Sequence, residues 1–216
     1  MKVCIQSFLL ILSAVLLCHL GFIERARSAE FGSIEIGGYA LGSWPKDQDL
    51  YNRGTTVPAS VQSGFGAGFT VGLFPTMLRG IIGLAFDSNL HGGALSFSNI
   101  AQGQRNERGR SDLLVSNTTA NLVFRYPGER VRPYIGAGVG WSSGTLLNPN
   151  IAGRNDQDFD STYAFVHQFL GGAQVSLTTK VFLFGEYRYV SANYHWEKLA
   201  FDFRTHYGLF GIGLRF

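Results

Sequence analysis

The last nine residues of the chain, 208–216, read GLFGIGLRF. Counting back from the terminal phenylalanine, every second side chain is large and apolar, whereas the positions between them are mostly small or charged. A period of two is typical of a β-strand whose two faces meet different surroundings. The apolar positions are Phe210, Ile212, Leu214 and Phe216. The C-terminus is therefore predicted to be a strand with one apolar face.

The same alternation recurs in about eight segments, and none of the chain after residue 30 keeps the spacing of an amphipathic helix. These segments are 32–41, 61–74, 79–90, 113–126, 132–142, 162–178, 181–191 and 203–216. Tight connections are expected at 75–78, 127–131 and 178–180. Long polar loops are expected at about 42–60, 91–112, 143–161 and 192–202. Short and long connections that alternate along the chain, together with an even number of strands, are typical of a transmembrane barrel.

We therefore expect an all-β protein, an eight-stranded antiparallel up-and-down transmembrane barrel with short periplasmic turns and long extracellular loops. Hydrocarbon offers no partner to an exposed backbone N–H or C=O group, so a sheet that crosses it must close on itself. The apolar faces must then point outward to lipid, and the hollow of the barrel is expected to be polar. Charged side chains on the inner face should pair as a luminal polar network: Glu35, Asp87, Arg125, Glu186, Arg188 and Arg215.

Residues 1–29 are expected to be a signal peptide that is removed. Lys2 precedes an apolar stretch from Phe8 to about Ile23, and the segment ends in Ser28 and Ala29. This stretch is shorter than the roughly 20 apolar residues that a membrane-spanning helix needs. Cleavage after either small residue fits the pattern. The mature chain, 30–216, is then a single barrel domain.

The mature chain offers little for cofactor, metal or nucleic-acid binding. Both cysteines, Cys4 and Cys18, lie in the leader, so no thiol remains for a disulfide or a thiolate metal site. The formal net charge of +3 falls towards neutrality once the leader is removed, which gives no electrostatic case for nucleic acid. The Gly-x-Gly runs at 64–68 and 136–140 lie inside predicted strands, whereas a phosphate-binding loop opens a helix. We expect no cofactor, no metal and no nucleic acid.

Three segments resemble the OmpA-like family of eight-stranded outer-membrane barrels: RPYIGAGVG at 132–140, EYRY at 186–189 and GIGLRF at 211–216. The resemblance spans nearly the whole mature chain. It implies secretion to the periplasm and insertion into the outer membrane of a Gram-negative bacterium. It also implies that Phe210, Ile212, Leu214 and Phe216 form the recognition signal for the barrel-assembly machinery. The family's implied roles include surface adhesion, serum resistance, envelope integrity and small-solute passage, and the fold does not choose among them.

Three side chains at positions that face outward are candidate lipid contacts at the outer rim of the barrel. At roughly 3.3 Å rise and 40° tilt, a residue 12 positions above the periplasmic end stands about 30 Å higher, beyond an apolar band about 25 Å tall. His167, Arg204 and His206 reach about this height. The expected partners are outer-membrane lipid and lipopolysaccharide, the barrel-assembly machinery, and an extracellular ligand or receptor at the loops. We expect a monomer.

The expected function is that of a surface barrel with a structural, adhesion or host-interaction role and no catalysis. A lipid-modifying enzyme needs a serine nucleophile with a histidine base in reach. No histidine of the mature chain stands two residues before a serine, the arrangement expected of a lipid-deacylating barrel. A narrow small-solute pore is the other alternative, because a glycine-rich interior is less completely filled. Charge clusters in the expected loops are usually solvated: Arg105, Arg108, Arg110, Asp156, Asp158 and Asp160.

Overall fold

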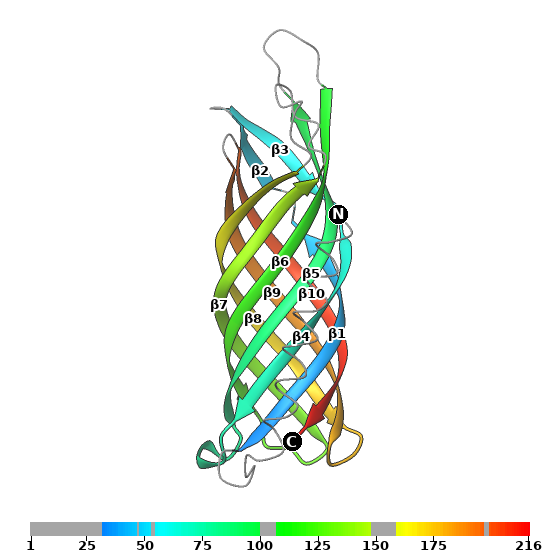
Figure 1. The fold of residues 1–216 in the computed structure, drawn as a ribbon, viewed down its shortest axis with the longest axis vertical. Coiled ribbons are helices and arrows are strands. Elements are labelled where there is room, and N and C mark those ends of the chain that lie inside the picture. The colour runs from blue at the N-terminus through cyan, green and yellow to red at the C-terminus, as the bar shows by residue number, and fades with distance from the viewer. Residues whose placement is uncertain (1–31, 47, 53–54, 100–106, 148–158, 197–198) are drawn as a thin grey trace, which may run out of the picture.

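A computed structural model describes residues 32–46, 48–52, 55–99, 107–147, 159–196 and 199–216 (Figure 1). The expected signal peptide and the loop residues Arg105, Asp156 and Asp158 lie outside these ranges. The strands are β1 (Ser33–Pro45), β2 (Gln48–Asn52), β3 (Thr55–Val61), β4 (Gly64–Phe74), β5 (Ile82–Asn99), β6 (Glu107–Arg125), β7 (Val131–Leu147), β8 (Phe159–Ser176), β9 (Val181–Trp196) and β10 (Leu199–Arg215). A short 3₁₀ helix, η1 (Thr76–Leu78), forms one predicted tight turn. No helix in the described ranges is long and apolar enough to cross a membrane.

Eight of these strands close into a barrel. Their order around the wall is β1, β4, β5, β6, β7, β8, β9 and β10, and every neighbouring pair is antiparallel. The last strand returns to the first, with a ladder that runs from Glu35↔Arg215 to Pro45↔Thr205. Closure satisfies the backbone groups of both terminal strands, as a sheet in hydrocarbon requires. The predicted eight-stranded antiparallel barrel is confirmed.

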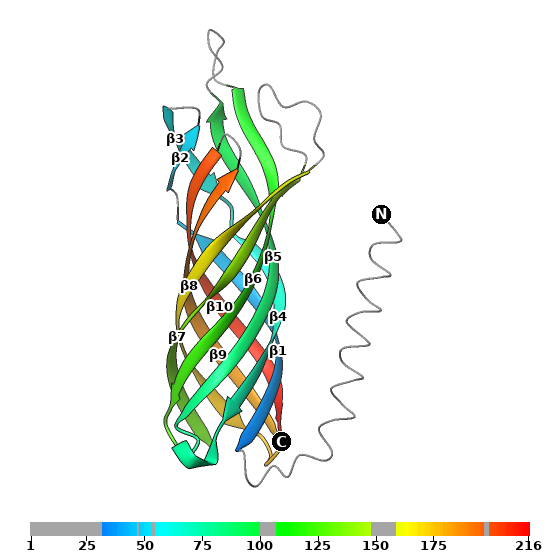
Figure 2. The same cartoon turned by 60° about the vertical axis from the view of Figure 1, so that its left-hand side comes forward.

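The other two strands correct the expectation of a loop at 42–60. β2 and β3 form a hairpin that pairs with β10 at Leu199–Phe201 and with β5 at Leu95–Phe97. The hairpin therefore continues the barrel wall above the ends of β1 and β4 (Figure 2). β1 ends at Pro45, which has no N–H to donate to a ladder, while β5 and β10 continue and their edges need a partner.

The other expected loops are also shorter, because the strands run on into them. The residues left between successive strands are 100–106 between β5 and β6, 148–158 between β7 and β8, and 197–198 between β9 and β10. A strand of 19 residues, such as β6, rises by about 40 Å or more at a typical tilt, well above an apolar band of about 25 Å. Polar residues suggested loops there, but the outer face of a strand in water is polar as well.

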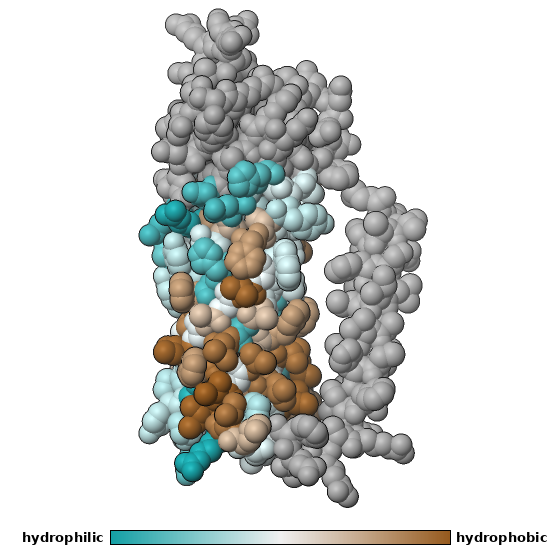
Figure 3. All heavy atoms as spheres, turned by 90° about the vertical axis from the view of Figure 1, so that its left-hand side faces the viewer, coloured by the Kyte–Doolittle hydropathy of each residue, from teal (hydrophilic) through white to brown (hydrophobic). Residues whose placement is uncertain are grey.

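The outer surface of the lower barrel is apolar, as predicted (Figure 3). Large exposed side chains at successive outward positions include Phe65, Phe69, Leu84, Phe86, Leu122, Phe124, Ile135, Val139, Phe169, Val175, Phe210 and Ile212. Tyr126 and Phe216 lie at the periplasmic end of this band, and Trp44 and Trp141 at the other end. Trp141 is 10 residues above Val131, a height of about 25 Å, which matches the apolar thickness of the membrane.

The upper interior contradicts the expected polar hollow. Apolar side chains fill it, among them Val61, Leu113, Val115, Leu146, Ala164, Val166, Ala192 and Phe203. The change of side occurs within single strands: on β6, Leu122 and Phe124 face outward, whereas Leu113 and Val115 face inward. Above the apolar band the wall is surrounded by water, so the hydrophobic effect draws apolar side chains into the barrel.

Glycines on the inner face let neighbouring strands approach closely. A Cβ atom on Gly140 would lie 2.0 Å from the Thr118 carbonyl oxygen, and one on Gly66 would lie 2.1 Å from the Leu90 carbonyl oxygen. Backbone atoms cannot yield to a side chain at such distances, so these positions require glycine. The Gly-x-Gly runs of the sequence therefore shape the barrel wall inside β4 and β7.

Candidate functional site

The six charged residues expected in the lumen all lie on the inner face of the barrel, and the structure divides them into two clusters. Glu35, Arg125 and Arg215 meet near the periplasmic end, and Asp87, Glu186 and Arg188 meet higher up. Each cluster joins strands that are far apart in the sequence.

The lower cluster is centred on the carboxylate of Glu35. Arg125 Nη1 and Arg215 Nε each donate a hydrogen bond to Glu35 Oε1 at 2.7 Å, and Gln174 Nε2 donates to Oε2 at 2.9 Å. The Arg125 guanidinium also lies 3.6 Å from the centre of the Phe74 ring. Charge-assisted bonds of this length are the strong ones, so the cluster ties β1, β6, β8 and β10 together at the periplasmic end.

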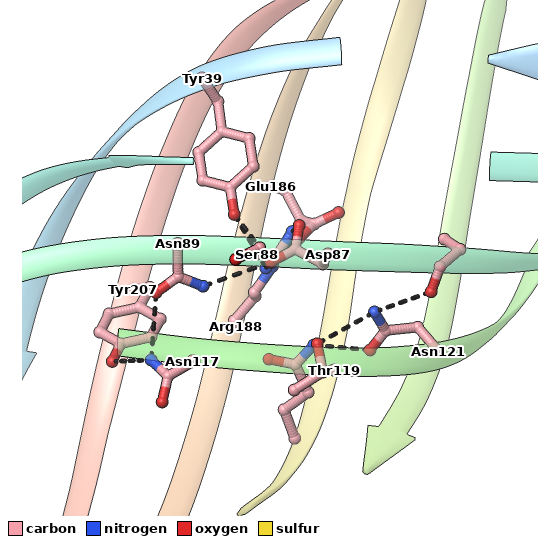
Figure 4. Close-up of polar contacts among 12 residues, drawn as sticks. Tyr39, Asp87, Ser88, Asn89, Asn117, Thr119, Asn121, Glu186, Arg188 and Tyr207 are labelled. Atoms are coloured by element: carbon pink, nitrogen blue, oxygen red, sulfur yellow. Dashed lines mark hydrogen bonds and ion pairs between the residues drawn. The ribbon is translucent and has the colours of Figure 1, made fainter. Parts of the chain in front are cut away.

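The upper cluster is centred on Arg188 (Figure 4). Its Nη1 and Nη2 atoms donate to Asp87 Oδ1 and Oδ2 at 2.6 and 2.8 Å, and its Nε donates to Glu186. Tyr39 donates its hydroxyl to Asp87 Oδ1 at 2.8 Å, and Tyr134 donates to Glu186 Oε2 at 2.7 Å. The guanidinium is almost completely buried, so its charge depends on these two carboxylates for compensation.

A cavity of about 50 Å³ lies between the two clusters. Its walls include Glu35 and Arg125 below, Glu186 and Arg188 above, and the aromatic rings Phe74, Phe182 and Phe184 at the sides. A space of this size holds about three or four water molecules. It is a small chamber within the lower barrel, with room for water.

A layer of amide and hydroxyl groups lies above the upper cluster, and the sequence reasoning missed it. Asn89 donates to Asp87 Oδ1 at 3.2 Å, Asn117 donates to Asn89 Oδ1 at 3.1 Å, and His91 shares a 2.7 Å hydrogen bond with the Tyr207 hydroxyl. The sequence does contain a signal for this layer on β6, where the polar residues Asn117, Thr119 and Asn121 recur at every second position. Apolar side chains of the upper interior, such as Leu113, Val115 and Leu146, lie further up the strands than this layer. A solute could cross the barrel only by displacing buried polar pairs and packed apolar side chains.

The structure places the three candidate rim residues on the outer faces of β8 and β10. His167 and Arg204 both lie opposite Ser191 of β9, and His206 lies one step lower on β10. His167 thus faces a serine, as a general base would. Within the described residues, however, no hydrogen bond joins the His167 ring to the Ser191 hydroxyl. This pair gives the enzyme alternative no geometric support.

The expected assembly signal lies on the outer face of β10. Phe210, Ile212, Leu214 and Phe216 are all exposed there. Their recognition by the assembly machinery stays a prediction. No group of three or more metal-ligating side chains occurs within the described residues.

Comparison with known proteins gives a family and a fold. The family described as "Outer membrane protein beta-barrel domain" matches residues 13–216. Among solved structures, Neisserial surface protein A (NspA) has a TM-score of 0.57 and 14% sequence identity, over 86% of this chain and 99% of that one. Ail, the attachment invasion locus protein of Yersinia pestis, in complex with the heparin analogue sucrose octasulfate, has a TM-score of 0.50 and 14% identity over the same shares. At this identity the likeness shows the fold alone. A search of curated proteins finds no match.

Proposed function

This chain belongs to the outer membrane protein beta-barrel family, and from that premise we propose that it is a non-conducting surface barrel that binds an extracellular partner at its outer end. The observation that carries the proposal is the filled lumen, in which two ion-pair clusters, an amide layer and the apolar side chains of the upper interior follow one another upward. NspA is named a surface protein and Ail an attachment invasion locus protein, which supports a surface role here as well.

The filled lumen predicts that the folded barrel does not conduct. We expect no steady single-channel openings in planar lipid bilayers, because an ion would have to disrupt the Arg188 cluster and cross the apolar side chains of the upper interior. The control is electrophoresis of the same preparation with and without boiling, where a mobility shift shows that the inserted protein is a closed barrel. Regular openings from protein that passes this control would favour the pore alternative.

Partner binding is supported by two strands that part above the apolar band. β8 pairs with β9 from Ser176↔Phe182 up to Val166↔Ala192, and both strands then continue without further pairs to each other. Figure 2 shows their upper ends diverging. The last shared pair stands about 25 Å above the periplasmic end, so the parting occurs near or beyond the limit of hydrocarbon. Water can satisfy backbone groups there, which is why the ladder is free to end.

The segment in which the two strands form no ladder pairs with each other is here called the β8–β9 seam (residues 161–165 and 193–196). Lower down, Leu177 N donates to Val181 O, so odd-numbered residues of both strands turn their N–H and C=O groups toward each other. By this alternation, backbone N–H and C=O groups point into the seam from four residues: Tyr163 and Phe165 on β8, and Asn193 and His195 on β9. Ladder pairing is replaced there by a side-chain bond, from Thr162 Oγ1 to His195 O at 2.7 Å.

Exposed strand edges pair readily with an extended segment of another protein. Edges that avoid such pairing usually carry charged residues or proline, but the seam reads STYAF on one side and NYHW on the other. The Tyr163 and Phe165 side chains are 76% and 60% exposed beside the seam, where they could pack on alternate side chains of an added strand. An extended protein segment is therefore the partner that fits.

A disulfide across the seam tests this proposal. Residues 163 and 195 would oppose each other if the β8–β9 ladder continued, so the double variant Tyr163→Cys/His195→Cys can be closed by oxidation. The probe is a fluorescent peptide of sequence SANYHWEK, which copies residues 191–198 and supplies the missing rungs. We expect saturable binding to the reduced variant and at least tenfold weaker binding after oxidation, measured by fluorescence anisotropy.

Two controls make the seam experiment specific. The same peptide with alternate amides N-methylated keeps its side chains but cannot donate ladder hydrogen bonds, so it should not bind. The single variant Tyr163→Cys should bind equally under reducing and oxidising conditions, because the chain's own cysteines, Cys4 and Cys18, lie in the expected leader. Equal binding to the open and closed double variant would exclude the seam as the docking surface.

A further inference from the structure

An aromatic row crosses the outer face of four neighbouring strands. Ladder pairs place Trp44 of β1 beside His206 of β10, His206 beside Tyr189 of β9, and Tyr189 beside Phe169 of β8. The row therefore presents ring faces and edges along a continuous path over β1, β10, β9 and β8.

The imidazole of His206 is held firmly within this row. Its ring stacks on Tyr187 with 5.8 Å between centroids and an angle of 27°, and it contacts the Tyr189 ring at 5.4 Å. The Tyr187 hydroxyl shares a hydrogen bond with His206 Nδ1. Ring packing and the hydrogen bond together fix the orientation of the imidazole, so its other nitrogen, Nε2, has a defined direction.

A row of cationic and polar side chains lies directly above the aromatic row. The Lys46 backbone N–H donates to the Arg204 carbonyl at 3.0 Å, Arg204 lies opposite Ser191, and Ser191 lies opposite His167. Lys46 and His167 are exposed. Arg204 forms an ion pair with Asp202 at 3.9 Å, and because the two side chains are 51% and 55% exposed, this pair holds little energy. The row keeps its positive charge available to a ligand.

The height of the two rows matches the outer boundary of the membrane. His206 and Arg204 lie 10 and 12 residues above Phe216, which corresponds to about 25 and 30 Å. On β10, His206 of the aromatic row therefore lies at the upper limit of an apolar band of about 25 Å, and Arg204 of the cationic row lies just beyond it, at the level of lipid phosphates.

We propose that these two rows form a binding site for the phosphorylated headgroup of an outer-leaflet glycolipid. Lys46 and Arg204 contact the phosphate, the aromatic row packs against the sugar and glycerol-level atoms, and the acyl chains lie on the apolar wall below. A membrane lipid fits better than a soluble phosphate compound, because Phe210 and Ile212 continue the surface downward with exposed apolar side chains. The site lies on the membrane-facing wall below the β8–β9 seam, and its occupancy does not depend on partner binding.

Lipid retention tests the site directly. The probes are bisphosphorylated lipid A and its dephosphorylated form, each mixed with the detergent-solubilised barrel, with bound lipid counted by native mass spectrometry. We expect the wild type to retain the phosphorylated form at least fivefold more than the dephosphorylated form. The variant Lys46→Gln/Arg204→Gln should lose that preference, since both cations are replaced by neutral side chains of similar size.

The matched control places the same substitutions at the other end of the barrel. Arg79 and Arg130 are exposed in the periplasmic turns, so Arg79→Gln/Arg130→Gln removes equal charge without touching the rows. This variant should retain lipid A as the wild type does. A second variant, Trp44→Leu, keeps all charges and should weaken retention of both lipid forms. Equal retention of the two forms by the wild type, or an equal loss in the periplasmic control, would overturn the assignment.

Discussion

Replacing Arg188 by methionine is expected to lower the free energy of unfolding of the barrel by about 3–5 kcal/mol, the usual cost of removing one partner from a buried ion pair. Methionine fills much of the same space but leaves Asp87 and Glu186 without a counter-charge inside the wall. Urea unfolding in lipid vesicles, followed by the heat-dependent mobility shift, measures the loss.

The compensating variant separates charge from packing. Arg188→Met combined with Asp87→Asn and Glu186→Gln removes the unpaired charges, so it should recover a large part of the lost stability. Arg79→Met removes an exposed arginine of the periplasmic turn and should change the stability by less than about 0.5 kcal/mol. If the triple variant were no more stable than Arg188→Met alone, the cost would come from packing, and the ion pairs would have little part in it.

The sequence could place these charges inside the barrel but could not pair them. The period of two assigns Glu35, Asp87, Arg125 and Arg188 to the face opposite the apolar side chains, and a charge facing hydrocarbon is too costly to be an alternative. Asp87 and Arg188, however, are 101 residues apart. Their meeting depends on how far each strand is shifted against the next around the whole barrel, which no local pattern encodes.

The apolar upper core escaped prediction for a related reason. Alternation shows that a strand has two different faces but does not show which face meets water and which meets lipid. On β6 the outward position is apolar at Leu122, whereas the inward position is apolar at Val115, so the face that carries the apolar residues changes along one strand. The sequence contained the change, but reading it required the height at which the membrane ends.

The end of the β8–β9 ladder was equally hidden from the sequence. Residues 161–165 and 193–196 both continue the alternation of their strands, so pattern alone predicts a strand on each side. Pairing is a property of two strands together, and β8 remains paired with β7 up to Leu147↔Phe159 while it leaves β9. Only the register shows where the β8–β9 ladder ends.

The position of the membrane leads to the second large expected effect, the cost of an arginine on the outer face. Phe86 is 53% exposed and lies four residues above Ile82, about 10 Å into the apolar band. Phe86→Arg should therefore destabilise the barrel in lipid vesicles by about 2–4 kcal/mol, the cost of arginine near the bilayer midplane. Urea unfolding in vesicles again provides the measurement.

The matched substitution lies on the outer face of the same barrel but above the band. Ser161 is exposed on β8, 15 residues above Ser176, which places it in water at about 38 Å. Ser161→Arg should change the stability by less than about 0.5 kcal/mol, because an exposed arginine in water buries no charge. A difference between the two variants that disappears when the protein is unfolded from detergent micelles would assign the cost to the thickness of the bilayer. Equal costs in vesicles would mean that hydrocarbon does not surround Phe86, and the apolar outer wall would then need another covering.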